Sequence, residues 1–194
     1  MSTAITGVIL AGGKSSRMGT DKGLLKLDSR PFVAHISATL QAAFDRVFLV
    51  ADDTSTYGFL GLETIGDVYR GCGPLGGIHS ALVHADGADI FVSACDTPFI
   101  TRELVQYIVE FPSGAAARIP SHNQQLHPLC GFYSQRCLQS VSEQLEAGRY
   151  RVLDFVDKIG ATVIPISPDL PFYREDLFSN INTPEDYPRN ENLL

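Results

Sequence analysis

The fold is decided by the stretch Ile5-Thr6-Gly7-Val8-Ile9-Leu10-Ala11-Gly12-Gly13-Lys14-Ser15-Ser16-Arg17-Met18-Gly19-Thr20-Asp21-Lys22. Its apolar beginning predicts a buried strand over residues 5–10 that runs directly into a glycine-rich loop. Ligands of open α/β sheets bind beyond the carboxyl ends of the strands. Consecutive glycines let a backbone approach such a ligand with its N–H groups turned inward, and Arg17 and Lys22 supply charge suited to phosphates. We interpret the stretch as a phosphate-binding loop, with a plain glycine turn as the alternative.

Short apolar runs and longer amphipathic runs alternate along the rest of the chain. Further strands are predicted at residues 47–51, 64–66, 90–94, 129–133 and 162–166. Helices are predicted at residues 31–44, 76–84, 102–109, 134–146 and 152–159. This alternation is typical of a mostly parallel sheet that is covered by helices on both faces. We therefore expect one three-layer α/β domain over residues 1–194, in which the later residues add an antiparallel edge or a small lobe.

The composition excludes several classes of protein. The chain has 194 residues and a formal net charge of −7, whereas a nucleic-acid binder usually carries a basic face, so we expect no nucleic-acid partner. No apolar run reaches the ~20 residues of a membrane span, and the first residues lack the pattern of a signal peptide. No two cysteines are spaced as C-x₂-C, so buried thiols are expected rather than zinc ligands. These features predict a cytoplasmic protein without a membrane partner.

Two well-known nucleotide-binding motifs match only in part. Gly13-Lys14-Ser15 resembles the end of a Walker A loop, but the first glycine of that motif would have to stand at Val8. Gly71-Cys72-Gly73-Pro74-Leu75-Gly76 fits the G-x-G-x-x-G pattern but has no good buried strand directly before it. We interpret Gly73–Gly77 as a second loop that approaches the same ligand, with a simple turn and helix entry as the alternative.

One carboxylate and two asparagines complete the candidate site. Asp96 follows the predicted strand 90–94, and a carboxylate at that edge can hold Mg²⁺ against nucleotide phosphates. The alternative role of Asp96 is the ordinary one of an aspartate in a turn, where the side chain accepts hydrogen bonds from backbone N–H groups. Thr183-Pro184 suits a helix start, which could also explain Asn182 but does not explain Asn180. We interpret Asp96 as a metal ligand and leave both a ligand role and a capping role open for the asparagine pair.

Together these segments resemble a known family. The motif from Leu10 to Lys22 is similar to the signature of nucleotidyltransferases that activate cofactors and sugars. Three further segments resemble the remaining motifs of the molybdenum cofactor guanylyltransferase family, namely Gly73-Pro74-Leu75-Gly76-Gly77, Cys95-Asp96-Thr97-Pro98 and Asn180-x-Asn182-Thr183-Pro184. The resemblance runs from residue 5 to about residue 187. The first motif alone identifies only the nucleotidyltransferase superfamily. The four motifs in this order are fairly specific for the molybdenum cofactor guanylyltransferase family.

The resemblance implies a Rossmann-like α/β/α fold and an enzyme that transfers GMP from GTP to molybdopterin with Mg²⁺ as cofactor. Matching motif positions assign the nucleotide to Leu10, Ala11, Gly12, Gly13, Lys22, Asp67 and Asp96. They assign catalysis to Arg17, Lys22 and Asp96, the last as the Mg²⁺ ligand, and the second substrate to Gly73, Gly77, Asn180 and Asn182. Family members can carry an asparagine at the end of the second strand, where this chain has Val50, so no base contact is assigned there.

Other functions remain open on the sequence. The same chemistry could use CTP, as in a molybdopterin cytidylyltransferase, or a sugar 1-phosphate as acceptor. A non-catalytic nucleotide sensor or carrier would keep the glycine loop but would need neither Lys22 nor Asp96. Transient contact with molybdenum cofactor insertion proteins is a further expectation for this family. For His127-Pro128 and Arg149-Tyr150-Arg151 we expect a packed or surface role rather than a role in seating the second substrate.

Overall fold

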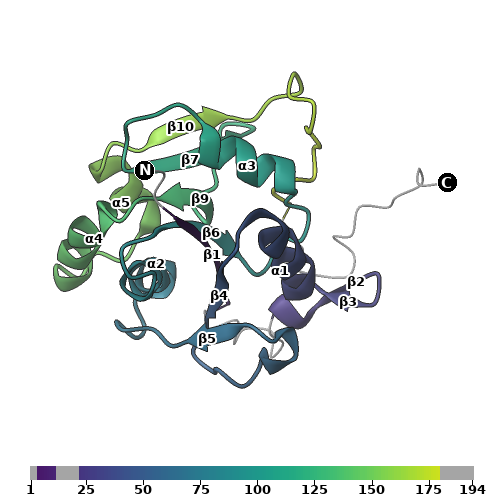
Figure 1. Ribbon diagram of the computed structural model, residues 1–194. Coiled ribbons are helices and arrows are strands. Elements are labelled where there is room, and N and C mark those ends of the chain that lie inside the picture. The colour runs from purple at the N-terminus through teal and green to yellow at the C-terminus, as the bar shows by residue number, and fades with distance from the viewer. Residues whose placement is uncertain (1–3, 12–21, 180–194) are drawn as a thin grey trace.

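The structure is a computed structural model that describes residues 4–11 and 22–179 (Figure 1). Its elements, in chain order, are β1 (Ile5–Leu10), the 3₁₀ turn η1 (Lys22–Leu24), β2 (Lys26–Leu27), β3 (Arg30–Pro31), α1 (Phe32–Ala43), β4 (Val47–Val50), the 3₁₀ turn η2 (Gly58–Leu60), β5 (Glu63–Ile65), α2 (Gly73–His84), β6 (Asp89–Ala94), α3 (Arg102–Glu110), β7 (Ala117–His122), β8 (Gln125–Leu126), β9 (Cys130–Tyr133), α4 (Cys137–Glu146), α5 (Val152–Lys158) and β10 (Thr162–Pro165). Within these residues, no helix has the length and apolar character needed to cross a membrane.

An eight-stranded sheet forms the centre of the molecule. Seven strands follow the order β10-β7-β9-β6-β1-β4-β5, and β8 pairs with β7. The strands β6, β1, β4 and β5 are parallel, as are β7 and β10, whereas β9 is antiparallel to both of its neighbours. The predicted mostly parallel sheet is confirmed. Its main antiparallel strand lies inside the sheet, between β6 and β7, and not at an edge.

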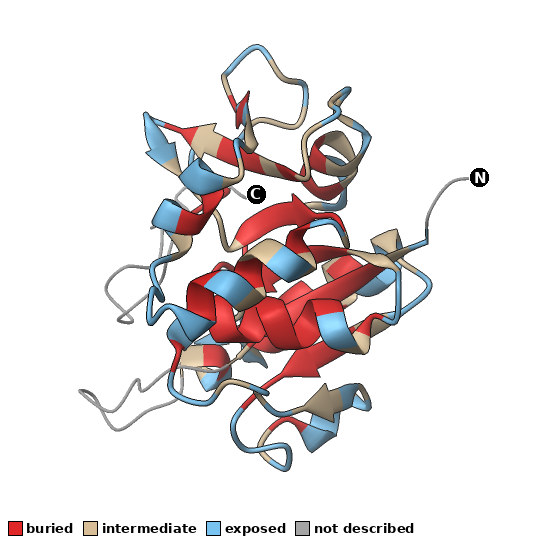
Figure 2. Cartoon of the chain, turned by 90° about the vertical axis from the view of Figure 1, so that its left-hand side faces the viewer, coloured by how far each residue is buried: buried red, intermediate tan, exposed pale blue. Residues whose placement is uncertain are grey.

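Helices cover both faces of this sheet. Successive residues of a strand point to opposite faces, so β1 contributes to two apolar clusters. Val8 and Leu10 pack in the cluster beneath α2, α4 and α5, whereas Ile9 packs in the cluster beneath α1 and α3. The two helix layers lie on opposite sides of the strands in Figure 1. Figure 2 shows the strands at the centre of the sheet buried and the outer faces of the covering helices exposed. The expected three-layer α/β/α architecture is confirmed.

The winding of the chain reverses at β1. From β1 the chain passes through α1 to β4 on one side, and it later returns through α2 to β6 on the other side. The three strands end in register, because Leu10 pairs with Val50 of β4 and with Ala94 of β6. In open α/β sheets the crevice beyond such a reversal is where ligands bind. The fold therefore directs the loops that follow β1 and β6 to one place.

The predicted helices and strands are confirmed apart from their ends, whereas the strands β2, β3, β7 and β8 were not predicted. Helix α2 begins at Gly73, three residues earlier than expected, because Pro74 is compatible with the first turn of a helix. Strand β7 was not predicted, since Pro120 interrupts its pattern and proline is unusual inside a sheet. The pairing with β9 involves only Ala117 and Arg118, so the missing N–H of Pro120 costs no hydrogen bond to β9.

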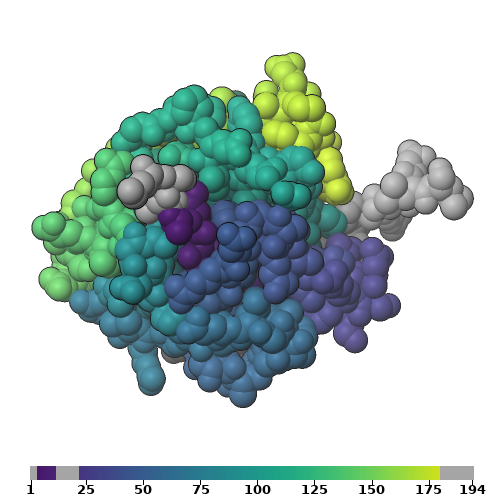
Figure 3. Space-filling model, viewed as in Figure 1, coloured from purple at the N-terminus to yellow at the C-terminus, as the bar shows by residue number. Residues whose placement is uncertain are grey.

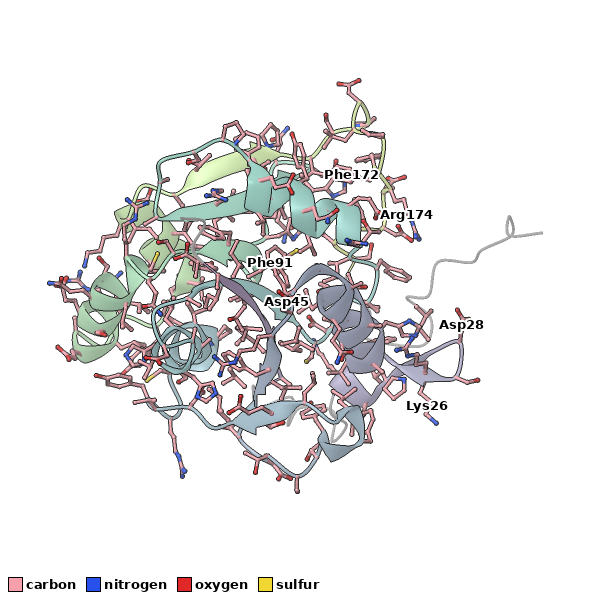
Figure 4. The ribbon with its side chains drawn as sticks, viewed as in Figure 1. Lys26, Asp28, Asp45, Phe91, Phe172 and Arg174 are labelled. Carbon is pink, nitrogen blue, oxygen red and sulfur yellow. The ribbon has the colours of Figure 1, made fainter. Side chains whose placement is uncertain are left out.

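After β10, residues 166–179 form a segment without helix or strand that returns toward the carboxyl ends of the strands. Tyr107 of α3 packs against Phe172 of this segment, with ring centroids 5.3 Å apart. Figure 3 shows the segment in yellow at the rim of the molecule, and Figure 4 labels Phe172 and Arg174 on it. Leu177 and Phe178 are buried in the cluster beneath α1 and α3. This packing brings the last described residues close to the end of β6.

We predict a large loss of stability for Phe91→Ala. Phe91 of β6 is fully buried and lies in the interior in Figure 4, with its ring centroid 5.8 Å from that of Phe44. Removing a buried phenyl group leaves a cavity, so the free energy of unfolding should fall by about 3–5 kcal/mol in urea denaturation. The control Val163→Ala, at a half-exposed position of β10, should change it by less than about 1 kcal/mol. Equal effects of the two substitutions would contradict the assigned core.

Candidate functional site

The candidate site lies at the carboxyl ends of β1, β4, β5 and β6. The end of β1 is held on both sides by backbone hydrogen bonds. The N–H of Ala11 donates to the carbonyl of Val50 (2.9 Å), and the N–H of Cys95 donates to the carbonyl of Leu10 (3.1 Å). These bonds fix the direction in which the loop after β1 leaves the sheet. Three residues predicted for this loop, Gly12, Gly13 and Arg17, lie outside the described residues.

Gly77 allows α2 to approach the end of β1 closely. A Cβ atom at Gly77 would lie 3.1 Å from Cδ2 of Leu10 and 3.8 Å from Oδ1 of Asp67. A larger side chain would therefore force α2 away from Leu10. Three residues that the sequence assigned to substrates, Leu10, Asp67 and Gly77, thus come together although they lie far apart in the chain. Gly73, the fourth position of this group, is exposed at the first residue of α2.

Asp67 carries a charge that the fold does not favour. Burial raises the pKa of its carboxyl group above the ordinary value, and the nearby charge of Asp52 raises it further. The hydroxyl of Ser80 opposes both effects by donating to Oδ1 of Asp67 at 3.4 Å. The two carboxylates approach each other because each follows the end of one of two paired parallel strands, β4 and β5. Asp52 belongs to this site, and the sequence analysis did not assign it a role.

Lys22 and Asp96 form an ion pair at the reversal point. The Nζ atom of Lys22 lies 3.6 Å from Oδ2 of Asp96, and both side chains remain partly accessible. The neighbouring Gly23 permits this approach, since a Cβ atom there would lie 3.3 Å from Cβ of Cys95. A partly exposed ion pair of this kind contributes at most about 1 kcal/mol to stability. Stability is therefore a weak reason for placing these two charges together, and ligand binding is a better one.

A pocket of about 220 Å³ opens beside Asp96. Its wall comes from the end of β6, from residues 125–130 and from Phe178. Asn180 and Asn182 lie outside the described residues, but Ser179, the last described residue before them, directly follows this wall. His127 also lines the pocket, although the sequence favoured a packed or surface role for it. The other residues in that expectation, Arg149, Tyr150 and Arg151, are exposed between α4 and α5.

The side chain of Val50 points into the core and not toward the candidate site. Its side chain is only 2% exposed and packs in the cluster beneath α2. The first side chain beyond β4 that reaches the surface is Asp52, which is exposed. Where family members can carry an asparagine, this chain therefore has an apolar core residue at the end of β4. A polar side chain that reaches the site from this part of the chain has to come from the residues after β4.

The chemistry of the site fits a magnesium ion shared with a substrate. The described residues contain no group of three or more histidine, cysteine, aspartate or glutamate side chains that could hold a metal alone. Mg²⁺ is commonly held by one or two carboxylates together with phosphate oxygens and water. Asp96 provides one accessible carboxylate at the point where the substrate phosphates would meet. The single carboxylate of Asp96 therefore fits Mg²⁺ whose other ligands are phosphate oxygens and water.

Comparisons with known proteins agree with this geometry. Residues 7–161 match the family model described as the MobA-like NTP transferase domain. The chain is 37% identical to the "Probable molybdenum cofactor guanylyltransferase" of Pelotomaculum thermopropionicum, over 93% of this chain and 89% of that protein. It is 32% identical to the molybdenum cofactor guanylyltransferase of Desulfosudis oleivorans, over 97% and 95% of the two chains. The solved structure of molybdopterin-guanine dinucleotide biosynthesis protein A from Archaeoglobus fulgidus superposes with a TM-score of 0.79 at 26% identity, covering 93% and 94%.

We predict that Asp67→Asn stabilises the protein at neutral pH. Because the pKa of Asp67 is higher in the folded protein than in the unfolded chain, the folded state binds more protons near that pKa, and wild-type stability falls as the pH rises through it. The substitution removes the unfavourable charge. In urea denaturation the variant should therefore be the more stable protein at pH 7, and its advantage should shrink as the pH is lowered.

Asp53→Asn provides a control of opposite sign. Hydrogen bonds from Ser55 and Thr56 lower the pKa of the exposed Asp53 carboxyl group. Its charge therefore stabilises the fold above the unfolded pKa, and this contribution is lost as the pH falls through the folded pKa. The variant should be less stable than wild type at pH 7. If Asp67→Asn behaved in the same way, the charge of Asp67 would not be disfavoured by the fold.

Proposed function

The chain belongs to the MobA-like NTP transferase family, and from this membership we propose that it transfers GMP from GTP to molybdopterin, forming the guanine dinucleotide form of the molybdenum cofactor. The observation that carries the proposal is the placement of the Lys22–Asp96 pair between the cluster of Leu10, Asp67 and Gly77 on one side and the pocket beside Asp96 on the other. The names of the curated relatives, which are 30–37% identical over most of the chain, support the acceptor and the base.

The reaction is an in-line displacement at phosphorus. A terminal phosphate oxygen of molybdopterin attacks the α-phosphorus of GTP, the new P–O bond forms, the bond to the β-phosphate oxygen breaks, and pyrophosphate leaves with its electron pair. No side chain has to form a covalent intermediate. The protein has to hold two anionic substrates in line and to offset their repulsion. Lys22 can do this from its position beside Asp96.

Mg²⁺ is the proposed cofactor, and Asp96 is the residue that would hold it. When bound, the ion neutralises negative charge on the phosphate oxygens around the reacting phosphorus. Arg17, Gly12 and Gly13 remain proposed contacts to the nucleotide phosphates, and Asn180 and Asn182 remain proposed contacts to the second substrate. Their motif positions support these roles. Leu10, Ala11 and Asp67 are the proposed contacts to the nucleoside part. The motif positions assign Gly73 and Gly77 to the second substrate, but Gly77 lies beside Leu10 and Asp67, so its position also suits a contact to the nucleotide.

Three alternatives differ in the base, the acceptor or the presence of chemistry. A cytidylyltransferase would use the same charges, and the apolar Val50 supplies no selection between bases. A sugar-phosphate nucleotidyltransferase would differ in the acceptor pocket. A carrier without catalysis has no use for an accessible ion pair at the reversal point.

We also propose that the chain works as one cytoplasmic domain over residues 1–194 and meets molybdenum cofactor insertion proteins transiently.

Nucleotide selectivity tests the proposal most directly. The melting temperature would be measured with GTP, CTP, ATP or UTP, each with and without Mg²⁺. A ligand that binds only the folded state at 100 times its Kd adds about 2.7 kcal/mol to stability, which raises the melting temperature measurably. We expect a Mg²⁺-dependent rise that is selective for GTP. Selectivity for CTP would move the proposal to the cytidylyltransferase branch, and no rise with any nucleotide would contradict a nucleotidyltransferase.

We predict that Asp96→Ala abolishes guanylyl transfer and that Lys22→Ala lowers kcat/KM by about 10²-fold or more, the scale of losing one preorganised charge contact. Incorporation of α-labelled GTP into molybdopterin measures both. Lys26→Ala is the matched control, because Lys26 is an exposed lysine on the neighbouring strand β2 and should leave turnover unchanged. Near-normal turnover in either of the first two variants would remove that residue from the mechanism.

A further inference from the structure

The pocket beside Asp96 has an aromatic wall that the proposed contacts do not use. The rings of His127 and Phe178 both line it and stack on each other, with centroids 4.2 Å apart and planes inclined by 16°. His122 supports this wall from behind, with its own ring centroid 5.6 Å from that of Phe178. Nε2 of His122 is occupied by a hydrogen bond with the hydroxyl of Tyr173 (3.1 Å). The wall is thus a packed cluster of rings from two distant parts of the chain.

The lining of this pocket suits an uncharged ring and not a phosphate group. Among the described lining residues there is no lysine or arginine, and the only carboxylate is Asp96 at one end. Burial, and then the charge of His122, lower the pKa of His127 to about 4, so its imidazole is neutral at physiological pH. Burial also raises the pKa of Cys130, which lines the same pocket, to about 12, so this thiol is neutral. Among the described residues that line the pocket, an anionic group would find no cation to pair with.

One polar atom in this apolar wall has no partner. Nε2 of His127 is buried and makes no hydrogen bond within the described part of the chain. A buried polar atom without a partner costs about 1–3 kcal/mol, so such atoms are uncommon unless a ligand or water satisfies them. This atom lies in the plane of the imidazole, so it can bond only to a group beyond the edge of that ring, whereas a ligand ring would stack on a face. The wall therefore offers a face for stacking and a separate hydrogen-bonding position at its edge.

The pocket lies on the opposite side of Asp96 from the proposed nucleoside contacts. Leu10, Asp67 and Gly77 gather at the ends of β1 and β5 and at the first turns of α2, whereas His127 stands just before β9, which pairs with the far side of β6. In-line transfer places the attacking phosphate opposite the leaving pyrophosphate, so the acceptor has to approach the α-phosphorus from a region that the nucleotide does not fill. The pocket itself has a volume of about 220 Å³, which is below the ~300–1,000 Å³ of pockets that hold drug-sized ligands. A pocket of this size suits one fused ring system.

We propose that this pocket binds the fused heterocyclic ring of the pterin acceptor, with the ring stacked on the wall formed by His127 and Phe178 and its phosphate directed toward the Lys22–Asp96 pair. The proposal rests on the proposed function for the identity of the acceptor. It makes His127 and Phe178 determinants of acceptor specificity, and it leaves the nucleotide to the other side of Asp96. Neither residue takes part in bond making or bond breaking.

The test separates the two substrates kinetically. KM for molybdopterin and KM for GTP would be measured for wild type, His127→Ala, His127→Phe and Phe178→Leu, with His84→Ala as a control at the carboxyl end of α2, where His84 pairs with Glu63. Stacking of a heterocycle on an aromatic side chain is commonly worth a factor of about 10 or more in affinity. We expect His127→Ala to raise the KM for molybdopterin about 10-fold with the KM for GTP unchanged. His127→Phe, which keeps the ring but removes Nε2, should show a smaller increase.

Each outcome decides for or against the pocket. A rise in the KM for GTP, in place of the KM for molybdopterin, would put the guanine base in this pocket. Unchanged KM values in folded His127→Ala and Phe178→Leu would leave the wall a purely structural role. Either result overturns the proposal. If His127→Ala does not fold, His127→Phe and Phe178→Leu carry the same comparison. Quenching of the fluorescence of free pterin by wild type but not by His127→Ala or Phe178→Leu supports the pocket without turnover, and equal quenching contradicts it. Absence of guanylyl transfer by wild type would instead contradict the proposed function.

Discussion

The pairing of β1 with β4 on one side and β6 on the other is the constraint on which the site depends. Because Leu10 is in register with both Val50 and Ala94, the loops after the three strands begin at the same level of the sheet. The hydrogen bonds from Ala11 to Val50 and from Cys95 to Leu10 extend this pairing by one residue. Asp96 then stands beside the end of β1, close enough for Lys22 to reach it. A shift of one residue in this register would turn Val8 and Leu10 to the opposite face and separate the charged groups.

The site also concentrates interactions that the fold does not need. Asp67 and Asp52 are brought together although each charge disfavours the other, and burial adds to the cost for Asp67. Nε2 of His127 is buried without a partner in the described residues. Natural proteins tolerate such costs chiefly where a ligand uses the groups concerned. The glycine at position 77 fits the same pattern, because it gives up helix propensity so that α2 can lie against Leu10 and Asp67.

Particular residues show why some features were predictable and others were not. The strand from Ile5 to Leu10 and the acid after the strand 90–94 were found because continuous apolar runs and the residues that end them are local signals. Strand β7 was missed because Pro120 is a local signal against a strand, while the arrangement that tolerates it depends on where β9 stops pairing. The role of His127 was missed because nothing near it in the chain reveals Phe178, which lies about fifty residues later.

The sequence by itself determined the fold class and the order of most of its elements, and it supplied the candidate residues Lys22, Asp67 and Asp96 and the hypothesis that the first loop binds phosphate. These follow from hydrophobic periodicity, from glycine and charge at fixed spacing, and from resemblance to a family. Only the tertiary structure decided that β9 runs antiparallel inside the sheet, that Asp52 raises the pKa of Asp67, and that an aromatic pocket adjoins Asp96. The physical reason is that these features depend on distances between segments that are remote in the chain, and such distances are set by packing and strand register rather than by local propensity.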